Sequence, residues 1–370
     1  MKKIVLSIVT IATMTTASMA NEVNKNGFWD RFHLKGDLRL RQESIDTDNF
    51  KKVSGDKDKD RERYRFRYSV NVDITDNILL ETAISSGKYN PTSGNVSFKD
   101  DESIQDYFIE ELNIDIADIK YSFDNSWIRV GKQKHDIYRP IGTQLVWDND
   151  IRLEGINYGY KNDSTMIRVG VNRLHREKGH KNGVNDDDIN IFIAQYVNTQ
   201  KFGNTSLNLG AAYYLYDGIK GATAPYDSGS MGNTADATGL YAEDYGIMEG
   251  FAEVKVKDLV MGMPAKVAII VAYNTLANDD NIGYDISAEL AITKKWKAAV
   301  TYRDVEKDAV FGAHNDSDFS GGGTDSKGYY FKTKYKFAKN VDIGAWFNWS
   351  KLGDTEIDYH RTQLDVILKF

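Results

Sequence analysis

Residues 61–74, RERYRFRYSVNVDI, alternate strictly between two kinds of side chain. One parity carries Arg63, Arg65 and Arg67, and the other carries only aromatic and aliphatic residues. A period of two is that of a β-strand, because successive side chains leave opposite faces of the pleat. In a transmembrane barrel the apolar face meets lipid and the charged face lines a hydrated interior. The pattern therefore favours a barrel over a soluble sandwich, whose outer face rarely carries three arginines in a row.

The first 20 residues have the features of a secretory signal peptide. Two lysines precede a short apolar run, and the final Ser-Met-Ala has the small-x-small pattern of a signal peptidase site. We therefore predict a signal peptide at residues 1–20, a short periplasmic segment at residues 21–31 and an outer-membrane barrel at residues 32–370. The protein is expected to be exported to the outer membrane of a Gram-negative cell.

Composition narrows the class further. After the leader, no apolar run approaches the roughly 18 residues that a membrane-spanning helix needs. With 47 basic and 54 acidic residues, the chain is not expected to bind nucleic acid. Cysteine is absent, so no disulfide and no cysteine-ligated metal is available. No catalytic motif emerges, and we expect neither enzyme activity nor a cofactor or metal site.

The same alternation recurs along the chain. It predicts about 16 antiparallel strands, an even number typical of bacterial barrels, at residues 32–43, 61–74, 78–85, 113–123, 127–133, 151–160, 165–172, 189–197, 207–216, 245–256, 266–274, 282–292, 296–306, 329–337, 341–350 and 359–370. The parity changes within residues 113–123, which predicts a β-bulge near Ile116. Connections alternate between short and long, as periplasmic turns and extracellular loops do. The last strand ends on Phe370, the terminal aromatic that is common in such barrels.

Two kinds of residue test this scheme. Trp29, Trp127 and Trp296 fall near predicted periplasmic ends, where an aromatic girdle is expected. Lys132 falls on the lipid-facing parity of its strand, where a lysine at mid-membrane costs about 2 to 4 kcal/mol. Either Gly131 forms a bulge that turns Lys132 inward, or Lys132 lies in a contact between subunits.

Several stretches resemble a known family. They are LKGDLRLRQESID at residues 34–46, DRERYRFRYSV at 60–70, SSGKYNPTSGN at 85–95, VGKQKHDIYRPIGTQLVWDNDIRLEGINYGY at 130–160, and the terminal strand. Together they resemble the Gram-negative "putative porin" family over nearly the whole mature chain. The stretch at 130–160 is the most specific, because its motifs are not generic barrel alternation. The resemblance implies a β-barrel channel of the outer membrane.

A barrel of about 16 strands is wide enough to leave an aqueous lumen, whose charges govern permeation. The predicted pore-lining basic residues are Arg39, Arg41, Arg63, Arg65, Arg67, Arg129, Arg168, Arg303, Lys332, Lys334 and Arg361. The predicted pore-lining acids are Asp37, Glu43, Glu81, Asp285 and Glu289. The arginines of the first, second and last strands either form a ladder that guides anions or pair with nearby acids and only solvate the wall.

By resemblance to porins whose third loop folds into the barrel, residues 134–150 are the candidate constriction. Asp136, Arg139, Asp148 and Asp150 would then form a mixed-charge ring, with Trp147 packing the loop on the wall. The alternative is an ordinary surface loop.

The function expected from these patterns is passive diffusion of small hydrophilic solutes through a water-filled barrel, with a weak preference for anions. The main alternative is a closed structural or adhesive barrel, and an outer-membrane enzyme is a further rival that lacks a visible site. Expected partners are outer-membrane lipid and lipopolysaccharide. A homotrimer is compatible with a porin of this size.

Overall fold

The protein is described by a computed structural model at residues 27–47, 59–87, 92–98, 112–174, 189–225, 229–260, 262–354 and 356–370. The predicted signal peptide and most of the segment at residues 21–31 lie outside these ranges. Within them, no helix has the length and apolar character needed to cross a bilayer.

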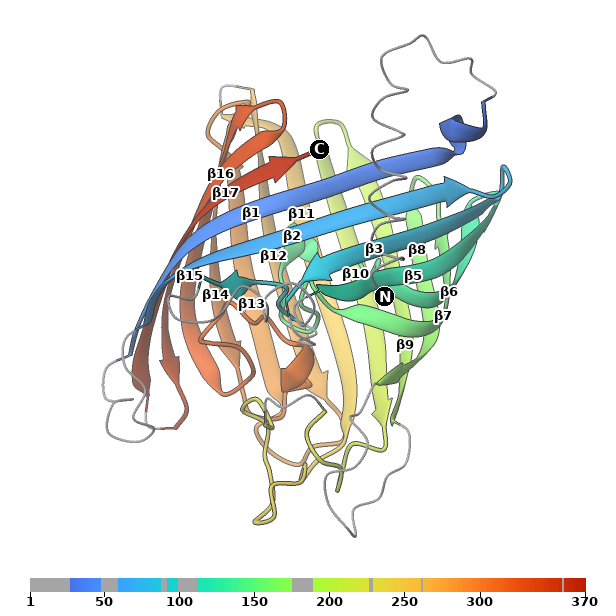
Figure 1. Ribbon diagram of the computed structural model, residues 1–370. Helices are drawn as coiled ribbons and strands as arrows, with labels where there is room; N and C mark the ends of the chain where they lie inside the picture. The colour runs from blue at the N-terminus through green and yellow to red at the C-terminus, as the bar shows by residue number, and fades with distance from the viewer. Residues whose placement is uncertain are drawn as a thin grey trace.

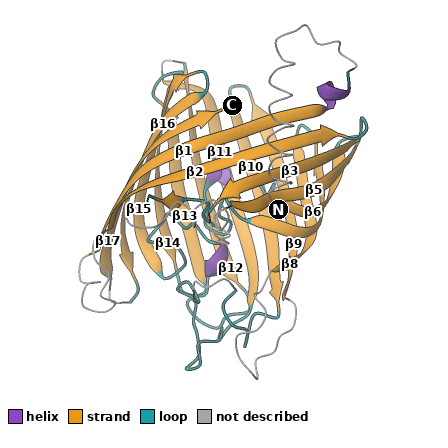
Figure 2. Cartoon of the chain, viewed as in Figure 1, coloured by secondary structure: helices purple, strands orange, loops and turns teal. Residues whose placement is uncertain are grey.

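One antiparallel sheet contains all the strands that the structure describes (Figures 1 and 2). They are β1 (Phe32–Thr47), β2 (Lys59–Asp73), β3 (Ile78–Ser86), β4 (Val96–Ser97), β5 (Leu112–Phe123), β6 (Ser126–Lys134), β7 (Arg152–Lys161), β8 (Thr165–Leu174), β9 (Ile189–Phe202), β10 (Thr205–Asp217), β11 (Tyr245–Val260), β12 (Met263–Asn274), β13 (Ile282–Ala291), β14 (Trp296–Val305), β15 (Ser326–Ala338), β16 (Val341–Leu352) and β17 (Ile357–Lys369). The short strand β4 pairs only with β2, and the other strands form a closed barrel of 16, as predicted. Three short 3-10 helices, η1 (Phe28–Arg31), η2 (Pro140–Gly142) and η3 (Gly312–His314), lie outside the sheet.

The barrel closes where its two ends meet. β1 pairs with β2 on one side and with the terminal strand β17 on the other, and Figure 1 shows blue β1 lying between them. The backbone of Phe370 extends this pairing, with the Gly36 amide donating to its carbonyl oxygen at 2.8 Å. The Phe370 ring covers Gly36, where any side chain would collide with it. Closure therefore depends on a glycine opposite the terminal aromatic.

The two faces of the terminal strand differ as the alternation predicts. On β17, Leu364 is 50% exposed and Val366 40%, whereas the neighbouring Arg361 and Gln363 are 6% and 1% exposed. Exposed apolar side chains on the outer face and buried polar ones on the inner face are the arrangement of a barrel in lipid. The apolar outer face of the strand is thus stabilised by the membrane, not by a second sheet.

The two rims of the barrel also differ. Short turns, such as residues 124–125, 203–204 and 339–340, lie at one rim together with η1 and the C-terminus. Longer connections, such as residues 218–244 and 306–325, lie at the other (Figure 2). This confirms the predicted sorting of the connections into short turns at one rim and longer loops at the other.

The irregularity predicted near Ile116 is confirmed. In the pairing of β3 with β5, Ala83 lies opposite Ile116 and Ile84 lies opposite Ile114, so Asp115 is an extra residue. One added residue reverses the parity, because it shifts the following side chains to the other face.

One expectation about an individual residue is wrong, and one of the two alternatives for Lys132 is excluded. Trp127 lies in register with Gly159 on the inner wall, and its ring is stacked by Arg168 at 4.3 Å, so it is not part of an outer girdle. Gly159 has no side chain, and this leaves the space that the indole fills. Gly131 does not turn Lys132 inward, since the register of β6 with β5 and β7 is continuous. Lys132 stays on the outer face and pairs with Glu154 at 3.5 Å.

Candidate functional site: the charged interior of the barrel

Six arginines gather on the inner face of three neighbouring strands. They form what we call the arginine wall: Arg39 and Arg41 on β1, Arg63, Arg65 and Arg67 on β2, and Arg361 on β17. Register places Arg39 opposite Arg65 and Arg41 opposite Arg63. Like charges in such cross-strand pairs repel each other, so the wall requires carboxylates nearby.

Acids on the same strands supply part of that compensation. Glu43 is completely buried and holds Arg61 and Arg361, each at 2.5 Å. Asp365 accepts two hydrogen bonds from Arg41, at 2.7 and 2.8 Å, in the bidentate geometry that favours arginine over lysine.

Asp37 is the third acid on these strands, and its carboxylate accepts a hydrogen bond from Arg65 at 2.9 Å. The arginine wall is therefore a network of ion pairs and not a row of free cations.

The loop at residues 134–150 lies inside the barrel. From the end of β6 it reaches the opposite wall, where the Tyr138 amide donates to Gln195 on β9 at 2.7 Å and the Tyr138 hydroxyl to Glu253 on β11. At its other end, Asp150 contacts Arg67 at 2.5 Å and Arg65 at 3.7 Å. The loop thus connects the arginine wall with the far side of the lumen.

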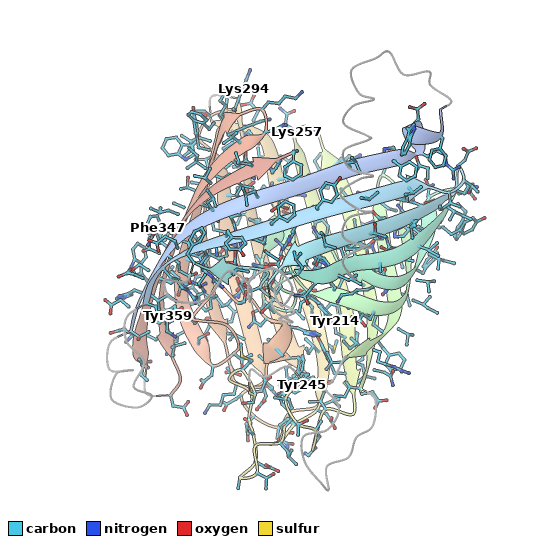
Figure 3. The ribbon with its side chains drawn as sticks, viewed as in Figure 1. Tyr214, Tyr245, Lys257, Lys294, Phe347 and Tyr359 are labelled. Atoms are coloured by element: carbon cyan, nitrogen blue, oxygen red, sulfur yellow. The ribbon has the colours of Figure 1, made fainter. Side chains whose placement is uncertain are left out.

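Trp147 anchors this loop. Its side chain is 1% exposed, and its ring lies 5.4 Å from Tyr214 and 6.2 Å from Tyr216 on β10. Tyr214, labelled in Figure 3, is completely buried. Arg139 donates to the Trp147 carbonyl oxygen at 2.9 Å. A hydrophobic core thus forms against β9–β12 and fills that side of the interior.

The remaining two acids of the loop have different surroundings. Asp136 pairs with Arg168 on the inner wall at 2.8 Å. Asp148 accepts from the backbone amides of Asp150 at 2.7 Å and Ser317 at 2.9 Å. Asp148 therefore fixes the backbone of two loops and makes no ion pair with the wall in the part of the chain that the structure describes.

A second loop, residues 306–325, also enters the lumen, and the sequence reasoning missed it. Asp318 lies between Arg41 at 3.3 Å and Arg361 at 3.0 Å. Asp316 lies 3.4 Å from Arg303. The Asp148 amide donates to the His314 carbonyl oxygen at 2.7 Å, which joins the two inserted loops. The signal that could have found this loop is its apolar run Ala-Val-Phe-Gly-Ala, because an exposed extracellular loop has no reason to carry one.

The other predicted pore-lining residues also lie on the inner face and make local pairs. Arg129 contacts Asp118 at 2.9 Å and also Glu81; Arg303 contacts Asp285 at 2.8 Å; Lys334 contacts Asp342 at 2.8 Å; Glu289 contacts Lys266 at 2.7 Å; and Lys332 lies 3.7 Å from the centre of the Trp346 ring. Asp118, Asp342 and Asp365 were not among the predicted acids, although strand parity alone could have placed them.

Burial and charge act in opposite directions on the loop acids. Burial would raise the pKa of Asp150 and of Asp318, but the nearby arginines outweigh it and hold both values below the usual range. Asp148 has no such partner, so burial, Asp150 and Asp316 raise its pKa well above the usual value. Burial lowers the pKa of His314 to about 3, so this side chain is neutral at physiological pH.

Pairing of the arginines is complete on the described strands. Every arginine on their inner faces has a carboxylate oxygen within 4.0 Å of its guanidinium group. No group of three or more histidine or acidic side chains among the described residues could hold a metal ion. The inner wall thus presents paired, fixed charges of both signs.

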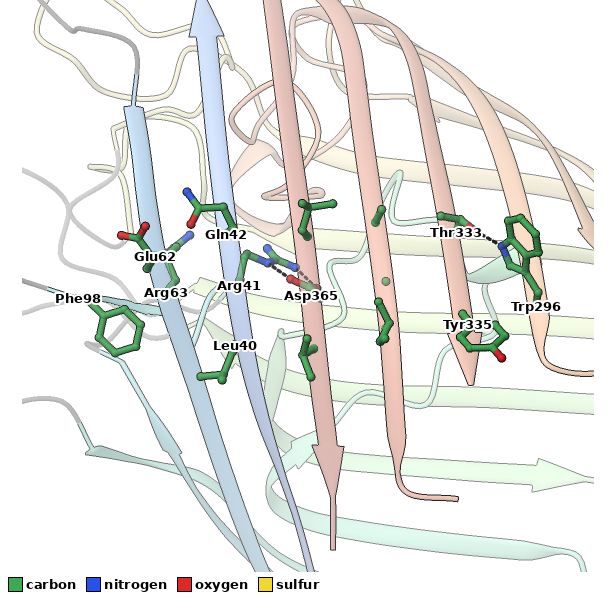
Figure 4. A pocket seen from close by; sticks show the side chains of 15 residues that line it. Leu40, Arg41, Gln42, Glu62, Arg63, Phe98, Trp296, Thr333, Tyr335 and Asp365 are labelled. Atoms are coloured by element: carbon green, nitrogen blue, oxygen red, sulfur yellow. Dashed lines mark hydrogen bonds and ion pairs between the residues drawn. The ribbon is translucent and has the colours of Figure 1, made fainter. Parts of the chain in front are cut away.

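The outer side of the arginine wall is apolar. A groove of 780 Å³ crosses the outer faces of β14–β17, β1 and β2, lined by residues such as Leu40, Leu364 and Trp296. Figure 4 shows this groove together with the Arg41–Asp365 pair of the same strands. One layer of sheet therefore separates a lipid-facing surface from a charged interior.

A closed barrel of 16 antiparallel strands, apolar outside and charged inside, with loops folded into its lumen, defines an outer-membrane porin. The family described as "Putative porin" matches residues 20–245 and 281–370. The chain belongs to this family.

Solved structures confirm the fold. OprB of Pseudomonas putida is 11% identical over 92% of this chain and 94% of its own, with a TM-score of 0.60. A mutant of the Rh. blastica porin is 11% identical over 92% of this chain and all of its own, with a TM-score of 0.54. OmpF of Salmonella typhi is 11% identical over 92% of this chain and 97% of its own, with a TM-score of 0.53. No curated protein sequence matches the chain.

Proposed function

We propose that this porin passes small hydrophilic solutes by passive diffusion and weakly prefers anions. The observation that carries the preference is the contrast between two kinds of cation on the inner wall. All its arginines are paired, whereas Lys161, Lys201 and Lys257, near the short-turn rim, have no carboxylate within 4.0 Å among the residues that the structure describes. Unpaired positive charge on a concave wall raises the local concentration of anions.

The narrowest part of the path is proposed to lie beside the arginine wall, at the level of the two inserted loops. Asp150 and Asp318 meet the arginines there, so the passage is lined by both signs of charge. A solute crossing it would exchange hydration for contacts with fixed charges, as in other selective pores.

The selectivity is tested by reversal potentials of single channels in a salt gradient. The variant with Arg63, Arg65 and Arg67 all replaced by alanine should shift the reversal potential toward cation preference, because Glu43, Asp37 and Asp150 then lose cationic partners. Lys294→Ala, at the short-turn rim, is the control for removing a positive charge elsewhere. An unchanged reversal potential in the triple variant would refute a role for the arginine wall.

A closed structural or adhesive barrel is the second candidate. The packing of Trp147, Tyr214 and Tyr216 against the inserted loops favours it, because these side chains fill part of the lumen. Swelling of liposomes with small sugars separates the two, since only an open channel admits sugar.

Export and assembly complete the proposal. We propose that residues 1–20 direct secretion, that the outer face contacts outer-membrane lipid and lipopolysaccharide, and that three chains associate. Fractionation of cells expressing a chain without residues 1–20 tests the first point. Gel migration of unheated protein in mild detergent tests the trimer.

A further inference from the structure

The unpaired lysines share one pocket. A cavity of 280 Å³ lies on the inner side of β7–β11 next to the turns at residues 162–164 and 203–204. We call it the lysine pocket, and its charged lining consists of Lys161, Lys201, Lys255, Lys257 and Asp163. Figure 3 shows Lys257 near the rim that carries the short turns. With four cations and one acid in its lining, the pocket is positive.

One wall of the lysine pocket is fixed by the inserted loop. The Tyr138 hydroxyl accepts from Asn208 at 2.7 Å and from Lys255 at 3.0 Å, and it donates to Glu253. Asn208 in turn accepts from Thr199 at 2.8 Å. The neutral polar side chains of Tyr138, Asn208 and Thr199 are therefore hydrogen-bonded to one another.

One of the four lysines, Lys255, is paired within the same network. Lys255 lies 3.1 Å from Glu253, which is 1% exposed and shielded from the cavity. The other three ammonium groups have no ion pair within the described ranges. They are therefore the groups that remain available to a ligand.

The spacing of the lysines indicates the shape of that ligand. Lys201 on β9 and Lys257 on β11 lie on opposite sides of β10, since Lys201 pairs with Ser206 and the Lys257 amide donates to the Asn204 carbonyl oxygen at 2.9 Å. Two strand spacings place their backbones about 10 Å apart. Cations on opposite sides of a cavity match an anion with two separated charges better than a single point charge. The cavity volume is at the lower end for small-molecule sites, which limits the ligand to a few carbon atoms.

We infer that the lysine pocket is a binding site for short organic dicarboxylates at the periplasmic end of the channel. This inference rests on the proposed function, since the site lies on the path that solutes take through the barrel. Its role is to hold a dianion for a time at the periplasmic mouth, so that such solutes are bound where they leave the lumen.

The test is inhibition of the chloride current by succinate in planar bilayers. Succinate should reduce the current in a saturable manner, and acetate at equal concentration should not. The double variant Lys201→Gln with Lys257→Gln should bind succinate about tenfold more weakly, because two charge contacts are lost. Lys294→Gln removes a charge from the same rim outside the pocket and should leave inhibition unchanged.

Three results would overturn the site. They are equal inhibition by acetate, stronger inhibition by inorganic phosphate than by succinate, or unchanged inhibition in the double variant. Titration calorimetry of the detergent-solubilised protein with succinate measures binding without a current. If the protein binds succinate but does not conduct, the proposed function fails and the site stands. If it conducts but does not bind succinate, the site fails alone.

Discussion

At the scale of single residues, the interior is organised by buried carboxylates. Glu43 is the most constrained, because Arg61, Arg361 and Gln363 all contact it while its side chain is inaccessible to solvent. Removing one partner of a buried charge network leaves the others uncompensated, which is costly, whereas exposed pairs contribute little.

Replacing Glu43 by glutamine should therefore destabilise the barrel by about 3 to 5 kcal/mol. Asp37→Asn is the matched control, because Asp37 is 24% exposed and contacts only Arg65 among the described ion pairs; its loss should cost less than about 1 kcal/mol. Urea unfolding followed by circular dichroism in detergent measures both. Equal losses in the two variants would show that burial of Glu43 does not matter.

Strand parity was enough to place Arg63, Arg65 and Arg67 on one face, because the period of two is visible in the sequence. The acidic partners of the wall arginines were harder to predict from the sequence. Arg41 pairs with Asp318 and Asp365, which are 277 and 324 residues away in the chain. Only Asp365 follows from closure of the barrel, because Asp318 belongs to a loop whose path no periodic pattern indicates.

At the scale of elements, the loop at residues 306–325 is held in the lumen by charge and by packing. Asp318 supplies the contacts with Arg41 and Arg361, and Phe311 is completely buried against Tyr216 at a ring distance of 4.8 Å. The sequence predicted the other inserted loop through family resemblance, whereas strand alternation ends where a loop begins and gives no information about its path.

Asp318→Asn should weaken docking of this loop by about 2 kcal/mol, since hydrogen bonds to charged groups contribute about 1.5 to 3 kcal/mol. Cleavage of the loop by an externally added protease should then be roughly 30-fold faster. Asp342→Asn is the control, because it also removes a paired carboxylate from the inner wall, but its partners Lys334 and Lys369 lie on β15 and β17 and not on the loop. Faster cleavage in the control alone would contradict the assignment.

Acid should not release the loop readily. Because the pKa of Asp318 is depressed in the folded protein, its stabilisation is complete above the usual aspartate value of about 3.9 and is lost only as the pH falls further. Protease resistance of the loop should therefore persist at about pH 5.

At the scale of the whole molecule, alternation, loop sorting and the terminal aromatic were sufficient to predict a closed barrel with both rims in the right order. These patterns were sufficient because a barrel in lipid must turn one apolar face of every strand to the membrane and must pair the backbone hydrogen-bonding groups of every strand edge. The filling of the interior was not predictable in the same way. It depends on contacts between loops and wall, such as Asp150 with Arg67, that leave no periodic trace.

The central claim is that this barrel encloses a conducting path. Purified protein added to a planar lipid bilayer at neutral pH tests it most directly. Discrete, stepwise increases in current, each growing with salt concentration, are the result expected of a water-filled lumen. A protein that is folded, as judged by its β-rich circular dichroism, yet inserts without any current steps would contradict the claim.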